Sequence, residues 1–409
     1  MKINGKYILK EINEYLLVLF IILSCGTQFF WNYHCAQTLF ILVLLTIVYF
    51  IRNNRIFKGN LNIVLFIMSI LIVVSIFHFD IAEVNGVYIL LAKLLVLLVI
   101  SSNIIKEDFF DKYITIMLIE LAISIVCFVV CSVGMERLLP GYYEQVMNYT
   151  YKGNSGYNII YLTPYYTIGW LSTAGFFGRN AGCFSEPGIH AIMLNLALLF
   201  FITSKKYVNL KSKKRIIIVV VIAIGVLTTK STGGVLELII ILFYAIAKKK
   251  LTTKNLKRDI IILSLLGIVV ALVIQYGSVF DKLVTKSGSF VTRSNDTLGG
   301  IQIAIEHFFI GCGFFTNLSL ILEKYSIFNI SNGFVEMLIR LGIPLTIILL
   351  YFFMRGVKRF FAAKGISCIL LYIFFILAIN IEPIFWNINI LLFMFHWKEN
   401  SRSSRVAQR

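Results

Sequence analysis

The fold class is decided by residues 113–134, whose sequence is YITIMLIELAISIVCFVVCSVG, a run with a single charged side chain at Glu120. A helix of about 20 mostly apolar residues is long enough to cross the hydrocarbon core of a bilayer. This run therefore predicts a transmembrane helix.

The composition of the whole chain agrees with that prediction. Of the 409 residues, 59% are hydrophobic and 14% are charged, whereas soluble domains are about 45–50% apolar and about 25% charged. This balance excludes a soluble enzyme, a secreted disulfide scaffold and a disordered chain. We predict an all-α, polytopic membrane protein with one integral membrane domain over 1–409.

Eleven further apolar runs, separated by polar breaks, resemble the run at 113–134. Because the first one lacks a small-x-small cleavage pattern, we expect it to be a span and not a signal peptide. The sequence therefore predicts about twelve spans, over 15–31, 37–51, 61–79, 87–104, 113–134, 186–203, 216–228, 234–247, 260–276, 333–354, 366–382 and 384–397.

The basic residues predict the orientation of these spans. If the N-terminus is cytoplasmic, 28 of the 38 Lys and Arg residues fall in inside segments and 8 in outside segments. Cytoplasmic loops of membrane proteins collect Lys and Arg, so we predict that both termini lie inside. The same rule explains the net charge of +18 without a nucleic-acid partner.

Two predicted outer segments, 134–185 and 277–332, are too long to be plain connections. In the second, the apolar residues from 298 to 309 have the spacing of an amphipathic helix that lies on the membrane surface. Between Tyr142 and Tyr166 the first segment holds eight tyrosines, which fit either an interfacial belt or stacking platforms for sugar rings. The inside segments lack a nucleotide-binding pattern, so we expect the working surface to face outward.

The segment GRNAGCFSEPGIHA, residues 178–191, places Arg179 and Glu186 at the outer mouth of the sixth span. Pro187 suits the first turn of a helix, and an acid before it suits the positive end of the helix dipole. One interpretation is a capped helix with Glu186 paired to Arg179. The other is a carboxylate and a guanidinium beside a water-filled cavity. His190 fits a satisfied helix histidine better than a base.

The segment LTTKSTGG, residues 227–234, joins two short spans on the outside. Hydroxyl groups at Thr229, Ser231 and Thr232, followed by Gly233, could cradle an anion through backbone N–H groups. The same residues also fit a capped turn in a re-entrant hairpin.

The second long segment contributes Arg293, a bend at Gly311–Phe314 that includes Gly313, and the sequence SNGFVEMLIRLG at 331–342. Ser331 or Asn332 suits the N-cap of the tenth span. Glu336 and Arg340 are spaced for an ion pair within a helix, yet ionisable residues within spans often face a cavity. Lys93, Glu120 and Glu237 extend this polar pattern to other spans.

The motifs described above come in the order seen in bacterial polysaccharide polymerases. Over roughly residues 175–350, and in its overall topology, the chain resembles the Wzy family of O-antigen and capsular repeat-unit polymerases, and more distantly the O-antigen ligases. The resemblance implies an enzyme of the bacterial cytoplasmic membrane. It would transfer a growing glycan from undecaprenyl pyrophosphate onto the terminal sugar of a lipid-linked repeat unit, on the outer face. A chain-length regulator and a flippase of the same pathway are its implied partners.

The resemblance also implies roles for individual residues. Arg179 and Arg293 would stabilise the departing pyrophosphate, and Glu186 would be the general base. We expect no metal and no cofactor. The residues expected to bind substrate are Thr229, Ser231, Thr232, Gly233, Gly313, Ser331, Asn332 and Arg340.

Two other functions compete with the polymerase. Ligases of the superfamily carry a His-Asn pair where this chain has Ser331-Asn332, and a serine is no base at neutral pH, which disfavours a ligase-type transferase. A flippase for the same lipid-linked unit fits twelve spans with a cationic interior. The two long outer segments, and the lack of a visible repeat between the halves of the chain, favour the transferase.

Overall fold

The computed structural model describes residues 5–27, 35–53, 55–78, 84–132, 142–144, 156–158, 166–167, 179–184, 186–208, 210–248, 288–314, 316, 318–325, 327, 330 and 332–399. Within these residues the chain is helical apart from three very short strands, so the predicted helical class is confirmed.

The helices follow the apolar runs of the sequence. In the first part of the chain they are α1 Gly5–Leu23, α2 Cys35–Asn53, α3 Lys58–Ile76, α4 Val84–Asn103, α5 Lys106–Ser132, α7 Pro187–Thr203, α8 Lys205–Val208, α9 Ser212–Thr228 and α10 Thr232–Lys248. In the second part they are α13 Gly288–Glu306, α14 Leu318–Lys324, α15 Gly333–Leu341, α16 Ile343–Phe361, α17 Ile366–Ile381, α18 Ile388–Leu391 and a 3-10 turn, η4, Leu392–Met394.

Four of the described helices, α2, α3, α4 and α5, are long and apolar enough to cross a membrane. Two shorter helices, α7 and α17, are also apolar. These helices support a membrane protein, whereas the described helices do not reach a count of twelve spans. The run at 260–276 lies outside the described residues.

The structure corrects two predicted spans. The run at 333–354 is divided into α15 and α16 because Gly342 has a φ of +78°, which a continuous right-handed helix cannot contain. The run at 384–397 holds only α18 and η4, and these buried residues pack against the bundle without crossing it as a helix. Hydropathy measures apolar character and does not detect either backbone change.

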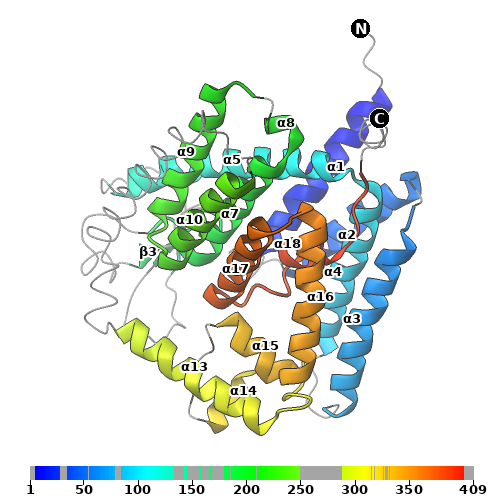
Figure 1. Cartoon of the computed structure of the whole chain (residues 1–409), viewed down its shortest axis with the longest axis vertical. Helices are drawn as coiled ribbons and strands as arrows, with labels where there is room; N and C mark the ends of the chain where they lie inside the picture. Colours follow the sequence, from blue (N-terminus) through cyan, green and yellow to red (C-terminus); the bar gives the residue numbers. More distant parts are fainter. Residues whose placement is uncertain are drawn as a thin grey trace.

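Helix α7 forms the centre of the bundle, and every residue from Gly188 to Ile202 is buried. It packs against α5, α9 and α10, and the ring of Phe200 stacks on Phe110 with 4.6 Å between the centroids. Close approach to α10 depends on Gly234, where a side chain would overlap Ala191. In Figure 1, α7, α10 and α17 lie next to one another in the middle of the molecule.

A cluster of charged side chains joins the N-terminal halves of α1 and α5, close to the end of α2. We call it the Lys112 cluster. The Lys112 ammonium lies 2.9 Å from Glu14 Oε2 and 3.1 Å from Glu11 Oε2, and the Tyr49 hydroxyl donates to Glu14 Oε1 at 2.6 Å. The side chains of Lys112 and Glu14 are only 4% and 2% exposed, so both charges depend on each other for solvation.

The residues after η4 form an extended strap over the ends of α3 and α4. The amide of buried Asn60 donates to the His396 carbonyl and to Ser101 Oγ, both at 2.9 Å, and its oxygen accepts from the His396 N–H. Asn60 therefore holds the C-terminal segment against the bundle.

Three short strands lie within the predicted first outer segment: β1 Tyr142–Glu144, β2 Gly156–Asn158 and β3 Tyr166–Thr167. They pair antiparallel in the order β1-β2-β3, and Tyr157 stands opposite both Tyr143 and Tyr166. The all-α prediction did not include this small sheet. It brings the backbones of the tyrosine-rich stretch together.

Candidate functional site

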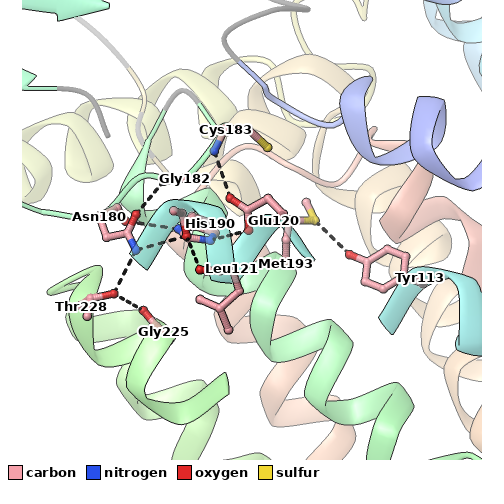
Figure 2. A network of polar contacts seen from close by, with 11 residues as sticks. Tyr113, Glu120, Leu121, Asn180, Gly182, Cys183, His190, Met193, Gly225 and Thr228 are labelled. Atoms are coloured by element: carbon pink, nitrogen blue, oxygen red, sulfur yellow. Dashed lines mark hydrogen bonds and ion pairs between the residues drawn. The ribbon is translucent and has the colours of Figure 1, made fainter. Parts of the chain in front are cut away.

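The segment 179–184 is a compact loop that lies on α5, α7 and α9 (Figure 2). Glu120 of α5 reaches up to it, and its Oε1 accepts from the Cys183 N–H at 3.1 Å. Gly182 has a φ of +57°, and a side chain there would overlap Glu120 Oε1. A glycine is thus required both by the backbone conformation and by the acid that holds the loop.

His190 of α7 lies under this loop and is fully buried. Its Nε2 lies 3.1 Å from Glu120 Oε2, and its Nδ1 lies 3.3 Å from the Asn180 carbonyl. The ring also stacks against Phe184 with 5.5 Å between centroids. These contacts favour the interpretation of His190 as a satisfied helix histidine that holds the loop, and they leave neither nitrogen directed toward solvent.

The same loop is joined to the end of α9. The Asn180 N–H donates to the Thr228 carbonyl at 3.0 Å, and the Asn180 amide donates to Thr228 Oγ1 at 3.1 Å. The Arg179 guanidinium Nε donates to the Thr229 carbonyl at 3.1 Å. Two motifs that are almost fifty residues apart in the sequence therefore form one structural unit, which we call the Arg179 region: residues 179–184 with 228–231.

The hydroxyl groups of the turn at 228–231 build the turn itself. Thr229 Oγ1 donates to the Val226 carbonyl at 2.7 Å and accepts from the Ser231 N–H at 3.2 Å. Ser231 Oγ accepts from the Gly234 N–H at 3.3 Å. These bonds match a capped turn, the second of the two interpretations, and they direct Thr229 and Ser231 toward their own backbone. Thr232 and Gly233 are half-buried at the start of α10.

Lys230 stands at the tip of this turn with a φ of +48°. It occupies the position just after the cap of α9, where glycine is the usual residue. A side chain in the left-handed region costs roughly 1–2 kcal/mol. The ammonium is half-buried, and burial together with the nearby Arg179 guanidinium lowers its pKa from the usual value.

Three helices begin around the C-terminal end of α17. A side chain on Gly188, in the first turn of α7, would overlap Glu382 Oε1. One on Gly233 of α10 would overlap Ile381, and one on Gly333 of α15 would lie 2.6 Å from the Ile379 carbonyl oxygen. The positive N-terminal ends of α7, α10 and α15 thus converge on residues 379–383.

Two acids accompany these helix ends. Glu186 is the N-cap of α7, and its side chain is exposed and makes no capping bond. Glu382 is buried, 6% exposed, against Gly188. Glu382 is not among the site residues predicted from the sequence. The sequence does contain a signal that could have identified it: Glu382-Pro383 stands between two apolar runs and repeats the Glu186-Pro187 dipeptide.

The Gly311–Phe314 bend packs on the break between α15 and α16. The Cys312 N–H donates to the Ile339 carbonyl at 2.7 Å, and the Ile343 N–H donates to the Phe308 carbonyl at 2.8 Å. Gly313 has a φ of +104° beside His78, at the end of α3. The bend is thus a tight backbone joint, and Gly313 supplies the conformation that the joint needs.

Arg340 holds this joint. Its Nε lies 2.6 Å from Glu336 Oε1, which is the ion pair that the spacing predicts, and its Nη1 donates to the Phe314 carbonyl at 2.7 Å. These contacts do not direct Arg340 toward a substrate. Asn332 is likewise engaged, because its Oδ1 accepts from the N–H groups of Phe334 and Val335 as the N-cap of α15.

Two predicted site residues remain to be placed. Arg293 lies in α13, and its side chain is outside the described ones; Ser331 is outside the described residues altogether. Helix α13 packs against α15 through Gly300, where a side chain would overlap Val335. The convergence of Arg293 with Arg179 therefore stays a prediction.

Across the described parts of the chain, no group of three or more His, Cys, Asp and Glu residues is arranged to hold a metal ion. Comparisons of the chain with models of protein families, with curated proteins and with solved structures find no match.

Proposed function

We propose that this protein is a polysaccharide polymerase of the Wzy type in the bacterial cytoplasmic membrane. It transfers a growing glycan from undecaprenyl pyrophosphate onto the terminal sugar of a lipid-linked repeat unit, on the outer face. The observation that carries the proposal is the Arg179 region, which holds a guanidinium beside Lys230, at the start of α10. In this proposal the chain crosses the membrane about twelve times, with both termini in the cytoplasm.

The chemistry of the reaction suits this arrangement. The bond between the sugar and the diphosphate breaks as negative charge builds on the leaving group, and a guanidinium can bind two phosphate oxygens at once. The N-terminal end of α10 adds partial positive charge next to the same turn. Arg179 therefore has the position and the chemistry to stabilise the departing diphosphate, with Arg293 of α13 as its expected partner.

The acceptor hydroxyl needs a base. Glu186 is exposed at the N-terminal end of α7, seven residues along the chain from Arg179, and remains our choice. Gly188 follows Glu186 by two residues in the chain, and the buried side chain of Glu382 lies against it. We assign Glu382 to holding the start of α7 in place, which would keep Glu186 in position.

A deletion strain tests the proposal. Loss of a polymerase leaves single repeat units on the cell surface, whereas loss of a flippase leaves none, and loss of a ligase leaves long chains that are not attached to their final acceptor. We expect single units in the deletion strain. A plasmid-borne Arg179→Ala variant, present at normal abundance in the membrane, should fail to restore long chains. Long chains of normal length with this variant would overturn the role of Arg179.

A matched control is Arg340→Ala. It removes a guanidinium from the same half of the chain, but one that is bound to Glu336 and to the Phe314 carbonyl. This variant should lower the amount of folded protein while the molecules that remain still make long chains.

A further inference from the structure

Glu237 of α10 is an acid buried in the centre of the bundle. Its side chain is fully buried, and its Oε2 accepts from the Asn195 amide of α7 at 3.0 Å. Its Oε1 has no hydrogen-bond partner. An ionised carboxylate in such surroundings is costly unless a cation balances it, and acids inside a membrane bundle are rare and commonly functional. The question is therefore in which form Glu237 exists.

The helices that pack closely on α10 are α7, α9 and α17, and no charged group among their described residues acts on Glu237. The charged residues of α9 lie in its first turn, at 213–215, whereas α10 begins next to its last turn. The other titratable side chains of α7, α10 and α17 are His190, Tyr244, Lys248, Cys368 and Tyr372. His190 is bound to Glu120, and the other four lie further from the start of α10, which packs on Ile381.

The contact between α7 and α10 places Asn195 against Glu237. One turn earlier Gly234 meets Ala191, and a side chain on Gly234 would overlap the Ala191 Cβ. Because residues three and four apart lie on the same face of a helix, this close contact continues to Asn195 on α7 and to Glu237 on α10. The Asn195 Nδ2 donates to the Gly234 carbonyl at 2.8 Å as well as to Glu237. Asn195 is therefore fixed at two points of α10.

A second unpartnered oxygen belongs to the same pair of side chains. Asn195 is fully buried, and its Oδ1, like Glu237 Oε1, has no hydrogen-bond partner. Two acceptor oxygens cannot satisfy each other without a hydrogen. A proton on Glu237 Oε1 supplies it, because the O–H can donate to Asn195 Oδ1 while Asn195 Nδ2 donates to Glu237 Oε2. One proton thus satisfies both oxygens and removes the buried charge.

We propose that Glu237 and Asn195 form a proton-binding site in the centre of the bundle, in which Glu237 is a neutral carboxylic acid that shares its proton with Asn195. The ligand is a single proton, which adds to the carboxylate without any change of oxidation state. The site joins α7 to α10 and holds the Gly234 carbonyl at the start of α10. It does not depend on the sugar transfer proposed above.

Infrared spectroscopy of the purified full-length protein tests the proposal, because a protonated carboxyl group has a C=O band that a carboxylate lacks. The protein is measured near neutral pH in a maltoside detergent, which has no carbonyl group of its own. We expect the band in the parent and its loss in Glu237→Gln, whose amide keeps the shape and both hydrogen bonds of the neutral acid. Identical spectra of the parent and Glu237→Gln in this region would overturn the proposal.

Glu120→Gln is the matched control for the spectra. Glu120 is also a buried acid, but each of its oxygens already has a hydrogen-bonding partner, the Cys183 N–H and His190. We expect this variant to keep the band. Asn195→Leu removes the acceptor of the shared proton, so the band should move to the higher frequency of a carboxyl group without that bond. An unchanged frequency would show that Asn195 does not share the proton, which contradicts the proposal.

The pH dependence of unfolding, measured with increasing dodecyl sulfate in mixed micelles, provides a second readout. A glutamate in the unfolded chain loses its proton above about pH 4.3, whereas Glu237 in the folded protein keeps it. Folding therefore takes up a proton, and the stability of the parent falls as the pH rises. Relative to Glu237→Gln, the unfolding equilibrium constant of the parent should rise about tenfold for each pH unit between about pH 5 and 7. A ratio that does not change with pH would refute the proposal.

Two further outcomes decide against a proton. If sodium chloride raises the thermal midpoint of the parent more than choline chloride does, and has no such effect on Glu237→Gln, the two oxygens hold a metal cation. If Glu237→Gln fails to fold, the bundle needs the charged form of the acid. Neither readout uses the glycan, so a failure here leaves the polymerase proposal to be judged by the deletion strain and Arg179→Ala.

Discussion

The Lys112 cluster and the Arg179 region are both built on α5, yet they use charge in different ways. In the Lys112 cluster a buried ammonium meets two carboxylates, Glu11 and Glu14, within 3.1 Å. The charges there compensate each other inside the protein. A cluster of this kind stabilises the fold and is of little use for binding a substrate.

In the Arg179 region the buried acid does not pair with a lysine or an arginine of the described residues. The buried acid, Glu120, is occupied by the Cys183 N–H and by His190, so it shapes the loop. The two cations, Arg179 and Lys230, are placed near each other at the end of α9. Burial alone therefore does not tell what a charged side chain does: buried Glu14 balances the charge of Lys112, whereas buried Glu120 holds the backbone of a loop.

The largest expected effect comes from breaking the Lys112 cluster. Lys112→Met leaves the Glu14 carboxylate buried without its ammonium, and breaking a buried pair in this way costs roughly 3–5 kcal/mol. Thermal unfolding in detergent should show a large drop, and the membrane should contain little protein. The protein that does fold should keep its glycan chain length, because this cluster serves the fold alone.

Lys206→Met is the control for that variant. Lys206 pairs with Asp111, but its side chain is 61% exposed, so the loss should be about 0–1 kcal/mol. Equal losses for the two lysines would show that burial of the Lys112 cluster contributes little, and the comparison would fail.

The next effect concerns the loop at 179–184, which holds Arg179 in place. Gly182→Ala places a methyl group on the Glu120 oxygen and strains a backbone with a φ of +57°, so the loop at 179–184 must shift and carry Arg179 away from the turn. We expect loss of long chains, with a stability loss of about 1–3 kcal/mol. Glycan length and thermal unfolding measure the two effects separately.

Gly365→Ala is the control for strain without a clash, because Gly365 also has a positive φ, +55°, with a ψ of −137°, and no atom lies within 4 Å of the added methyl group. It should show the backbone strain without the loss of long chains. A normal chain length in Gly182→Ala would mean that the position of Arg179 is not set by this loop.

A smaller effect is expected for Glu120→Gln. The amide keeps the size of the side chain and can accept one bond, but it cannot accept from both the Cys183 N–H and an Nε2–H of His190. The cost should be about 1–3 kcal/mol, with a partial reduction in chain length. Glu237→Gln, a second buried acid in the bundle, should leave chain length unchanged if Glu120 acts through the loop.

The smallest effect distinguishes a helix cap from a substrate contact. Asn332→Ala removes the N-cap of α15 and should cost about 1 kcal/mol, whereas Asn332→Asp keeps the cap. Both variants should make chains of normal length. A loss of long chains without a loss of stability in Asn332→Ala would support the prediction that Asn332 binds substrate.

Much of the fold could be predicted from the sequence because hydropathy reports on each run separately. The runs at 37–51, 61–79, 87–104 and 113–134 correspond to α2, α3, α4 and α5. The division at Gly342 was missed because apolar residues continue on both sides of it, although Gly342 and Pro344 together are the usual signal of a helix boundary. The run at 384–397 was also wrongly predicted as a span from its hydropathy. Its apolar residues are buried by packing against the bundle, and they do not form a membrane-spanning helix.

The site could be predicted in part. Arg179, Glu186 and the turn at 227–234 stand out as polar motifs between apolar runs, and the structure joins Arg179 to that turn. The connection between residues 179–184 and that turn depends on bonds between Asn180 and Thr228. Such pairing between distant segments leaves no periodic pattern in a single sequence. The roles of Thr229, Asn332 and Arg340 in holding the backbone were not separable from binding roles for the same reason.

Gly311 and Gly342 touch backbone to backbone: a methyl group on Gly311 would lie 2.6 Å from the Gly342 nitrogen, and one on Gly342 would lie 2.8 Å from the Gly311 nitrogen. Neither position can accept any other residue unless the partner segment retreats. Any substitution at Gly311 or Gly342 therefore pushes the bend at 311–314 away from the break between α15 and α16, and no substitution at the other position can compensate, since both already have the smallest residue.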